Sequence, residues 1–179
     1  MATALDPPLD RSRDHVRGPE GAIELVEYGD FECPYCRDAA PAIAKVLDRM
    51  GDGVAFAFRH LPIPERHPHA QRAAEAAEAA AAQGRFWEMH DVLFANQRAL
   101  EDEDLASYAR ELGLDVERFA AELSGGVHAA RVREDLASAE RMRLAGTPAF
   151  FVAGESYGGF YDVESLTWAL EDALAARGG

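Results

Sequence analysis

Alternating and helical patterns of apolar residues divide the first third of the chain into three elements. Residues 22–28 mix β-branched, aromatic and alternating polar positions, which is typical of a strand, and residues 54–60 alternate in the same way. Between them, apolar residues recur at helical spacing over 39–47, after Pro34, a residue suited to a first helical position. The pattern predicts a strand–helix–strand unit with parallel strands and a right-handed crossover.

The middle of the chain, from about residue 65 to 145, changes to helical periodicity throughout. An alanine-rich helix is expected over 70–83, ending at Gly84, and further helices follow it, separated by glycines. After this block, residues 149–153 predict a strand and 156–159 its hairpin partner. Asp162 is then expected to cap a final helix.

The predicted order is therefore β-α-β, a helical block, and β-β-α, with a short edge strand expected over 15–17. Two adjacent prolines and scattered charge at the start of the chain indicate a loose segment. We divide the sequence into a flexible tail over 1–12, a first βαβ part over 13–64, an inserted helical block over 65–145 and a ββα part over 146–179.

Composition narrows the function classes. With 179 residues, 48% of them hydrophobic, the chain can bury the core of one domain and is not expected to be disordered. A formal net charge of −14 argues against nucleic acid or an anionic membrane as the main partner. The N-terminus has neither a basic nor an apolar signal region, so we expect a cytoplasmic location unless a signal segment has been removed.

The only two cysteines, Cys33 and Cys36, lie one helical turn apart where the first strand passes to the helix. The unpaired N–H groups and the positive dipole end of a helix N-terminus favour a thiolate. We therefore expect the pKa of Cys33 to fall below the free value of about 8.5 and Cys36 to be the more buried, resolving thiol. In a reducing compartment such a pair is catalytic or metal-binding rather than a structural disulfide.

This arrangement resembles the thioredoxin fold, and the helical block is similar to the DsbA-like branch of that superfamily. Residues 27–36, Glu-Tyr-Gly-Asp-Phe-Glu-Cys-Pro-Tyr-Cys, resemble its active-site segment, and residues 146–150, Gly-Thr-Pro-Ala-Phe, resemble its cis-proline loop. Residues 86–91 resemble part of the helical domain of bacterial members. The resemblance implies an α/β thioredoxin fold, a central mixed β-sheet flanked by helices, with an inserted all-helical subdomain.

The same resemblance implies roles for five residues. Cys33 would be the attacking thiol and Cys36 the resolving thiol, with Pro148 as the cis-proline beside them. The Thr147 backbone would bind an extended substrate peptide, and Glu27 would be a buried carboxylate that carries the proton of the resolving thiol. Without the resemblance, Gly-Thr-Pro would be an ordinary trans turn, and Glu27 would be a polar residue of an alternating strand facing water.

We considered Arg59, near the end of the second strand, as an ionic partner for Glu27. No metal, flavin or nucleotide is implied, because the electrons reside on the two sulfur atoms. The implied partners are protein or peptide thiols and disulfides, and a redox partner of the thioredoxin or glutathione type. Strongly oxidising members carry a histidine where this chain has Tyr35, so we expect a reduction potential between the reducing and the strongly oxidising extremes.

Two other function classes fit parts of the pattern. Cys33 and Cys36 could join His67 and His69 in a zinc site, although one residue between the histidines is fewer than such sites normally have. A glutathione-dependent transferase or isomerase of thioredoxin fold would generally not need the second cysteine. The histidines elsewhere in the helical block, at 90 and 128, are expected to be structural.

Overall fold

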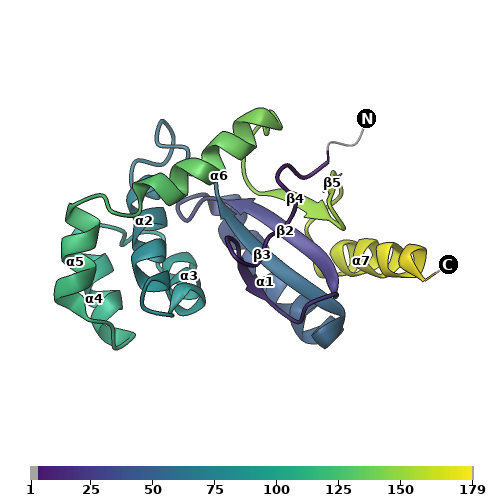
Figure 1. Ribbon diagram of the computed structural model, residues 1–179, viewed down its shortest axis with the longest axis horizontal. Helices are drawn as coiled ribbons and strands as arrows, with labels where there is room; N and C mark the ends of the chain where they lie inside the picture. Colours follow the sequence, from purple (N-terminus) through teal and green to yellow (C-terminus); the bar gives the residue numbers. More distant parts are fainter. Residues whose placement is uncertain (1–3, 179) are drawn as a thin grey trace.

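The computed structural model describes residues 4–178, which form a five-stranded sheet with helices against both of its faces (Figure 1). The strands are β1 (His15–Arg17), β2 (Ile23–Gly29), β3 (Val54–His60), β4 (Ala149–Val152) and β5 (Glu155–Tyr157). The helices are α1 (Pro34–Met50), α2 (Ala70–Ala81), α3 (Phe86–Ala95), α4 (Asp102–Glu111), α5 (Val116–Ser124), α6 (Ala129–Arg141) and α7 (Val163–Arg177), with a short 3₁₀ turn, η1 (Gly51–Gly53), before β3.

The sheet has the strand order β1-β3-β2-β4-β5. β2 and β3 are parallel, in register from Ile23 opposite Val54 to Gly29 opposite His60, which confirms the predicted strand–helix–strand unit. The other three pairings are antiparallel, so the sheet is mixed as expected. The predicted edge strand β1 is present, and β5 begins one residue before the predicted hairpin partner.

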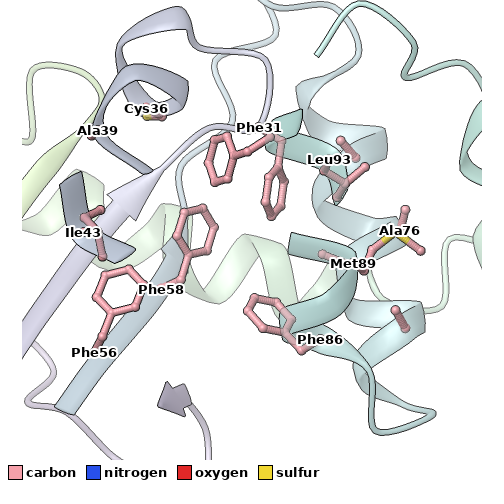
Figure 2. Close-up of a cluster of buried hydrophobic side chains, with 14 of the residues drawn as sticks. Phe31, Cys36, Ala39, Ile43, Phe56, Phe58, Ala76, Phe86, Met89 and Leu93 are labelled. Atoms are coloured by element: carbon pink, nitrogen blue, oxygen red, sulfur yellow. The ribbon is translucent and has the colours of Figure 1, made fainter. Parts of the chain in front are cut away.

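Alternation along β2 and β3 sends side chains to two separate buried clusters. Leu25, Phe56 and Phe58 face α1, while Val26 and Tyr28 face α6 on the other side of the sheet. The first cluster is the larger one and passes from the sheet into the helical block, where the rings and aliphatic side chains of α2 and α3 continue it (Figure 2). The sheet is thus packed on both faces, against α1 on one side and against α6 on the other.

The segment between β3 and β4 is helical, as the sequence predicted. α2, α3, α4 and α5 lie together beside the sheet, and α6 returns across it (Figure 1). Because the larger cluster contains residues of both the sheet and this block, the two parts share one core. The boundaries at 64/65 and 145/146 stay a prediction.

The described part of the N-terminal segment, residues 4–12, is not the flexible tail that the two prolines suggested. Leu5 is buried, and its N–H donates to the Gly154 carbonyl at 2.8 Å. The carbonyls of Pro7 and Pro8 accept hydrogen bonds from the buried Arg59 guanidinium at 2.9 and 3.1 Å. The segment is held because its backbone oxygens satisfy a buried cation, a long-range requirement that local composition does not reveal.

Candidate active site

The two cysteines occupy the first turn of α1. Cys33 is the N-cap residue, with extended backbone angles of φ −72° and ψ 123°, and its carbonyl accepts the Arg37 N–H at 3.2 Å. Pro34 occupies the first helical position, where its missing N–H costs nothing. Both cysteines are free thiols, and both are buried. A strand that ends in a tight turn thus places two thiols at the positive end of a helix dipole.

Cys33 is poised as a thiolate. A hydrogen bond from the Cys36 thiol is the main cause that lowers its pKa, to about 5, against the opposing effect of burial. The Thr147 side chain and the backbone N–H groups of Cys36 and Tyr35 lower the pKa further. This confirms the direction that the helix N-terminus predicted, and Cys33 should be largely ionised at neutral pH.

Cys36 is shifted in the opposite direction. Burial is the main cause that raises its pKa, and the neighbouring Cys33 thiolate and Glu27 raise it further. Just after the end of β2, the Asp30 N–H donates to the Cys36 sulfur, and the two atoms are 3.5 Å apart. One turn of helix therefore holds one ionised and one protonated sulfur, which is the division of labour that a two-step exchange requires.

The loop before β4 brings Thr147 and Pro148 to the same place from far along the chain. The Cys33 sulfur lies 3.5 Å from the Thr147 carbonyl oxygen, 114 residues away in sequence. The Thr147–Pro148 peptide bond is cis, the isomer that the resemblance implied. Thr147 and Pro148 are half-buried, so the loop forms part of the surface around the thiols.

Glu27 is buried beneath the cysteines rather than exposed to water. Its side chain is 1% exposed and lies on the sheet face that packs against α1. Burial, followed by the charge of the Cys33 thiolate, raises its pKa to about 8, while an interaction with Cys36 opposes this shift. A carboxyl group with a pKa near neutrality beside a resolving thiol can accept and release a proton at physiological pH.

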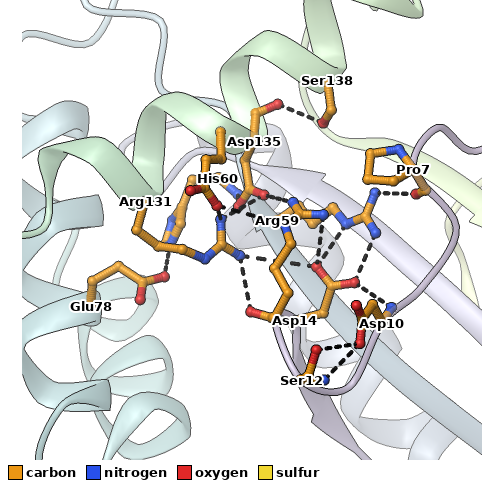
Figure 3. A network of polar contacts seen from close by, with 12 residues as sticks. Pro7, Asp10, Ser12, Asp14, Arg59, His60, Glu78, Arg131, Asp135 and Ser138 are labelled. Carbon is orange, nitrogen blue, oxygen red and sulfur yellow. Dashed lines mark hydrogen bonds and ion pairs between the residues drawn. The ribbon is translucent and has the colours of Figure 1, made fainter.

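The expectation that Arg59 pairs with Glu27 is wrong. Arg59 belongs to the opposite face of the sheet because neighbouring strand residues alternate, and its guanidinium forms a bidentate pair with Asp14 at 2.8 and 3.0 Å. It also donates to the Tyr28 hydroxyl at 2.9 Å. Figure 3 shows Arg59 and Asp14 within their network of polar contacts. Both charged side chains of the pair are fully buried, so Arg59 anchors the start of the chain and does not pair with Glu27.

Sequence reasoning missed two groups that hold the active-site segment in place. The Gln97 side-chain amide donates to the carbonyls of Phe31 and Cys33, at 2.8 Å each, from the loop after α3. The Asp30 carboxylate bonds the ring of His67 at 2.8 Å and thereby ties the loop after β3 to the end of β2. No periodic pattern could have found these contacts, because each joins a single loop residue to a distant segment.

The arrangement does not favour the zinc alternative. His67 pairs with Asp30, and His69 pairs with Glu32 at 2.8 Å, so both imidazoles bind carboxylates. Within residues 4–178, no group of three or more histidine, cysteine, aspartate or glutamate side chains is placed to hold a metal ion.

The fold and the dithiol at the helix N-terminus define a protein of thioredoxin type. The sequence model of the family described as Thioredoxin matches residues 10–172, and the chain belongs to this family.

Solved structures with the same fold include DsbA-like proteins, as the resemblance implied. BdbD from Bacillus subtilis, in its oxidised form, is 23% identical with a TM-score of 0.84, over 96% of this chain and 98% of its own. A thioredoxin-like oxidoreductase from Silicibacter pomeroyi is 29% identical with a TM-score of 0.81, over 93% and 99%. α-DsbA1 of Wolbachia pipientis is 17% identical with a TM-score of 0.77, over 94% and 93%.

Curated relatives carry another name. The chain is 48% identical over 169 residues to a protein named Na(+)/H(+) antiporter NhaA 1 from Salinispora arenicola, covering 94% of this chain and 26% of the relative. The NhaA of Herminiimonas arsenicoxydans is 49% identical, with 96% and 27% covered. The chain spans about a quarter of the length of these relatives, so their name does not define its function. No helix within residues 4–178 has the length and apolar character needed to cross a bilayer.

Proposed function

We propose that this protein is a thiol–disulfide oxidoreductase that exchanges a Cys33–Cys36 dithiol or disulfide with protein or peptide substrates. The observation that carries the proposal is the placement of two free thiols in the first turn of α1, with the Cys33 sulfur 3.5 Å from the Thr147 carbonyl oxygen. This placement shifts the pKa values of the two thiols in opposite directions. The names of solved structures with this fold, which include a thioredoxin-like oxidoreductase, support it.

In the reducing direction, the Cys33 thiolate attacks a substrate disulfide. A Cys33–substrate disulfide forms, the substrate disulfide breaks, and one substrate sulfur leaves as a thiolate. Cys36 then passes its proton to ionised Glu27 and attacks the Cys33 sulfur, which releases the second substrate thiolate and leaves the Cys33–Cys36 disulfide. The oxidising direction reverses every step.

A substrate peptide would lie against the loop that carries Thr147. The Thr147 carbonyl flanks the attacking sulfur and can accept a backbone N–H from an extended peptide. The surface nearby offers apolar contacts, because Tyr35 is 62% exposed and Phe160 is 81% exposed. Phe160 also borders a cavity of about 570 Å³ between α1 and the start of α7, large enough for a substrate side chain.

The Cys36→Ser variant tests the proposal. Without the resolving thiol, the variant should accumulate a mixed disulfide between Cys33 and a cysteine-containing peptide, visible by mass spectrometry, and should lose exchange with that peptide. The matched Cys33→Ser variant should form no such species. Undiminished turnover by Cys36→Ser would favour a glutathione-dependent transferase or isomerase instead, and stoichiometric zinc in the reduced protein would favour the metal-binding module.

We propose that the redox partner of this exchange is of the thioredoxin or glutathione type. The cytoplasmic location expected from the sequence stays a prediction. Fractionation of cells that produce the protein tests it.

A further inference from the structure

A cavity of about 400 Å³ lies behind the dithiol, between α1 and α3 and above the strands β2 and β3. Its wall is mainly apolar and includes Leu47 and Ile43 from α1 and Phe94 from α3. The same lining includes Glu27 from β2 and His90 from α3. The volume is far above the roughly 30 Å³ that one water molecule occupies, so the cavity can hold several.

Both of these side chains carry a buried polar atom that lacks a partner. Glu27 Oε1 and His90 Nε2 make no hydrogen bond to any residue within 4–178, and neither atom is exposed at the protein surface. Buried polar atoms in native proteins nearly always have a partner, either protein or water. Since Glu27 and His90 line one cavity, water in that cavity can satisfy both and connect them.

Contacts within α3 leave His90 ready to accept a proton. Its Nδ1–H donates to Asp91 Oδ1 at 2.8 Å, which fixes the tautomer in which Nε2 is the free acceptor. Asp91 is itself held by Arg17 at 2.8 Å, and the Arg17 guanidinium lies over the Trp87 ring. Burial lowers the pKa of His90, and Asp91 opposes this shift, so the ring is neutral at rest and passes a proton on rather than keeping it.

We propose that His90 is the proton acceptor for Glu27 during the resolving step, acting through water in this cavity. The inference rests on the proposed thiol–disulfide exchange and adds to it the route by which the proton leaves. His90 does not touch the sulfur atoms, so it acts through Glu27.

The proton balance is as follows. Cys36 gives its proton to Glu27 as its sulfur bonds to Cys33 and the substrate thiolate leaves. Glu27 then passes the proton through water to His90 Nε2, the Asp91 carboxylate stabilises the imidazolium, and the proton passes to solvent. In the oxidising direction the same groups return the proton.

The charge on Cys33 decides when Glu27 gives up its proton, while the positive charges near the cavity help to keep His90 from holding one. Arg17, Arg37 and Asp91 also line the cavity, and the charge of His60 is among the causes that lower the pKa of His90. The Cys33 thiolate helps to keep the proton on Glu27. That negative charge disappears when Cys33 forms the mixed disulfide with the substrate. The pKa of Glu27 then falls, so Glu27 releases its own proton to the cavity and is ionised when Cys36 must give up a proton.

The test uses the reduced full chain and dithiobis(nitrobenzoic acid), which releases one coloured thiolate when Cys33 attacks and a second when Cys36 resolves. Two variants each keep one structural feature of His90: His90→Asn keeps a donor to Asp91, and His90→Phe keeps the ring. Both variants should slow the release of the second thiolate about 10- to 100-fold and leave the rate of the first release within about twofold. The expected slowing is smaller than the ~10²–10⁴-fold loss for a direct acid–base group, because water can still accept the proton. The control His128→Asn changes a histidine that pairs with Glu122 away from the cavity and should alter neither release.

Two further readouts separate proton transfer from packing. In a Glu27→Gln background, the His90 changes should have no additional effect, because the relay is already broken. The deficit should also shrink as the pH rises above 8, where hydroxide replaces the acceptor. The inference would be overturned if both His90 variants released the second thiolate at the wild-type rate, or if the His90 changes had an equal effect with and without Glu27. A wild-type protein that releases only one thiolate would instead overturn the proposed function itself.

Discussion

Replacing Glu27 with glutamine should stabilise the reduced protein at neutral pH. The carboxyl group is buried with one oxygen unpartnered, and its pKa is raised from 4.5 to about 8. The folded state therefore keeps a proton that the unfolded chain gives up above pH 4.5. Glutamine resembles the protonated group in shape and has no proton to lose.

The size of the effect follows from linkage. A raised carboxyl pKa contributes stability that is fully present below pH 4.5 and is lost as the pH rises through about 8. At about 1.4 kcal/mol per pH unit, the wild-type carboxyl costs about 3 kcal/mol at pH 7. The glutamine amide must find partners in the cavity, which takes back about 1 kcal/mol. We expect a net gain of about 2 kcal/mol for Glu27→Gln.

Urea unfolding of the reduced protein at several pH values measures this gain. Wild type and variant must be compared at equal pH, because the lowered pKa of Cys33 has the opposite slope: its stabilisation is present above pH 9 and is lost as the pH falls through about 5. The gain should grow from pH 5 to pH 8. It should be smaller in the oxidised protein, where the Cys33 charge is absent.

Glu24→Gln is the matched control for this experiment. Glu24 lies on the same strand at a half-buried position, and the change should alter the free energy of unfolding by less than about 0.5 kcal/mol. If Glu27→Gln left the unfolding free energy unchanged at pH 8, or lowered it, Glu27 could not be the strained, protonated carboxyl described above.

Two other predictions concern the dithiol and the buried ion pair. Tyr35→His would place a cation beside Cys33, and the disulfide should become more oxidising by about 30 mV for each unit by which the pKa of the Cys33 thiol falls. Equilibration with glutathione measures this reduction potential. An unchanged potential would show that position 35 does not act on the thiolate. Arg59→Leu should lower the free energy of unfolding by about 3–5 kcal/mol because it removes the bidentate partner of the buried Asp14 carboxylate and the donor to the Pro7 and Pro8 carbonyls. The control Glu88→Gln, at a partly exposed ion pair with Arg85, should change the free energy of unfolding by under about 1 kcal/mol, and equal losses in the two variants would refute the buried pair.

Features with a strong local pattern could be predicted from the sequence. Alternation located β2 and β3, helical spacing located α1, and the CxxC spacing located the thiols at the start of α1. In each case neighbouring residues carry the signal, because the strand and helix periods fix which side chains share a face. The loop that faces Cys33 came from the resemblance, since its peptide geometry depends on contacts from other segments.

Features that depend on distant pairs could not be predicted. Arg59 was placed on the wrong face because the pairing of strands decides which side of the sheet a given residue of β3 occupies. Its partner Asp14 lies 45 residues earlier, in a segment with no periodic pattern. His90 was expected to be structural, and only the cavity shared with Glu27 suggests otherwise. Each of these features depends on charged or polar groups from distant segments of the chain, which local periodicity does not reveal.

The pH dependence of Cys33 alkylation tests the central claim most directly. With the reduced protein and iodoacetamide, the rate of Cys33 modification, followed by mass spectrometry, should rise with a midpoint near pH 5 and reach a plateau by pH 7. Cys36 should remain unmodified because burial raises its pKa and keeps it protonated. A midpoint near that of an ordinary thiol, about 8.5, would mean that Cys33 is not activated. The proposed exchange chemistry would then lose its basis.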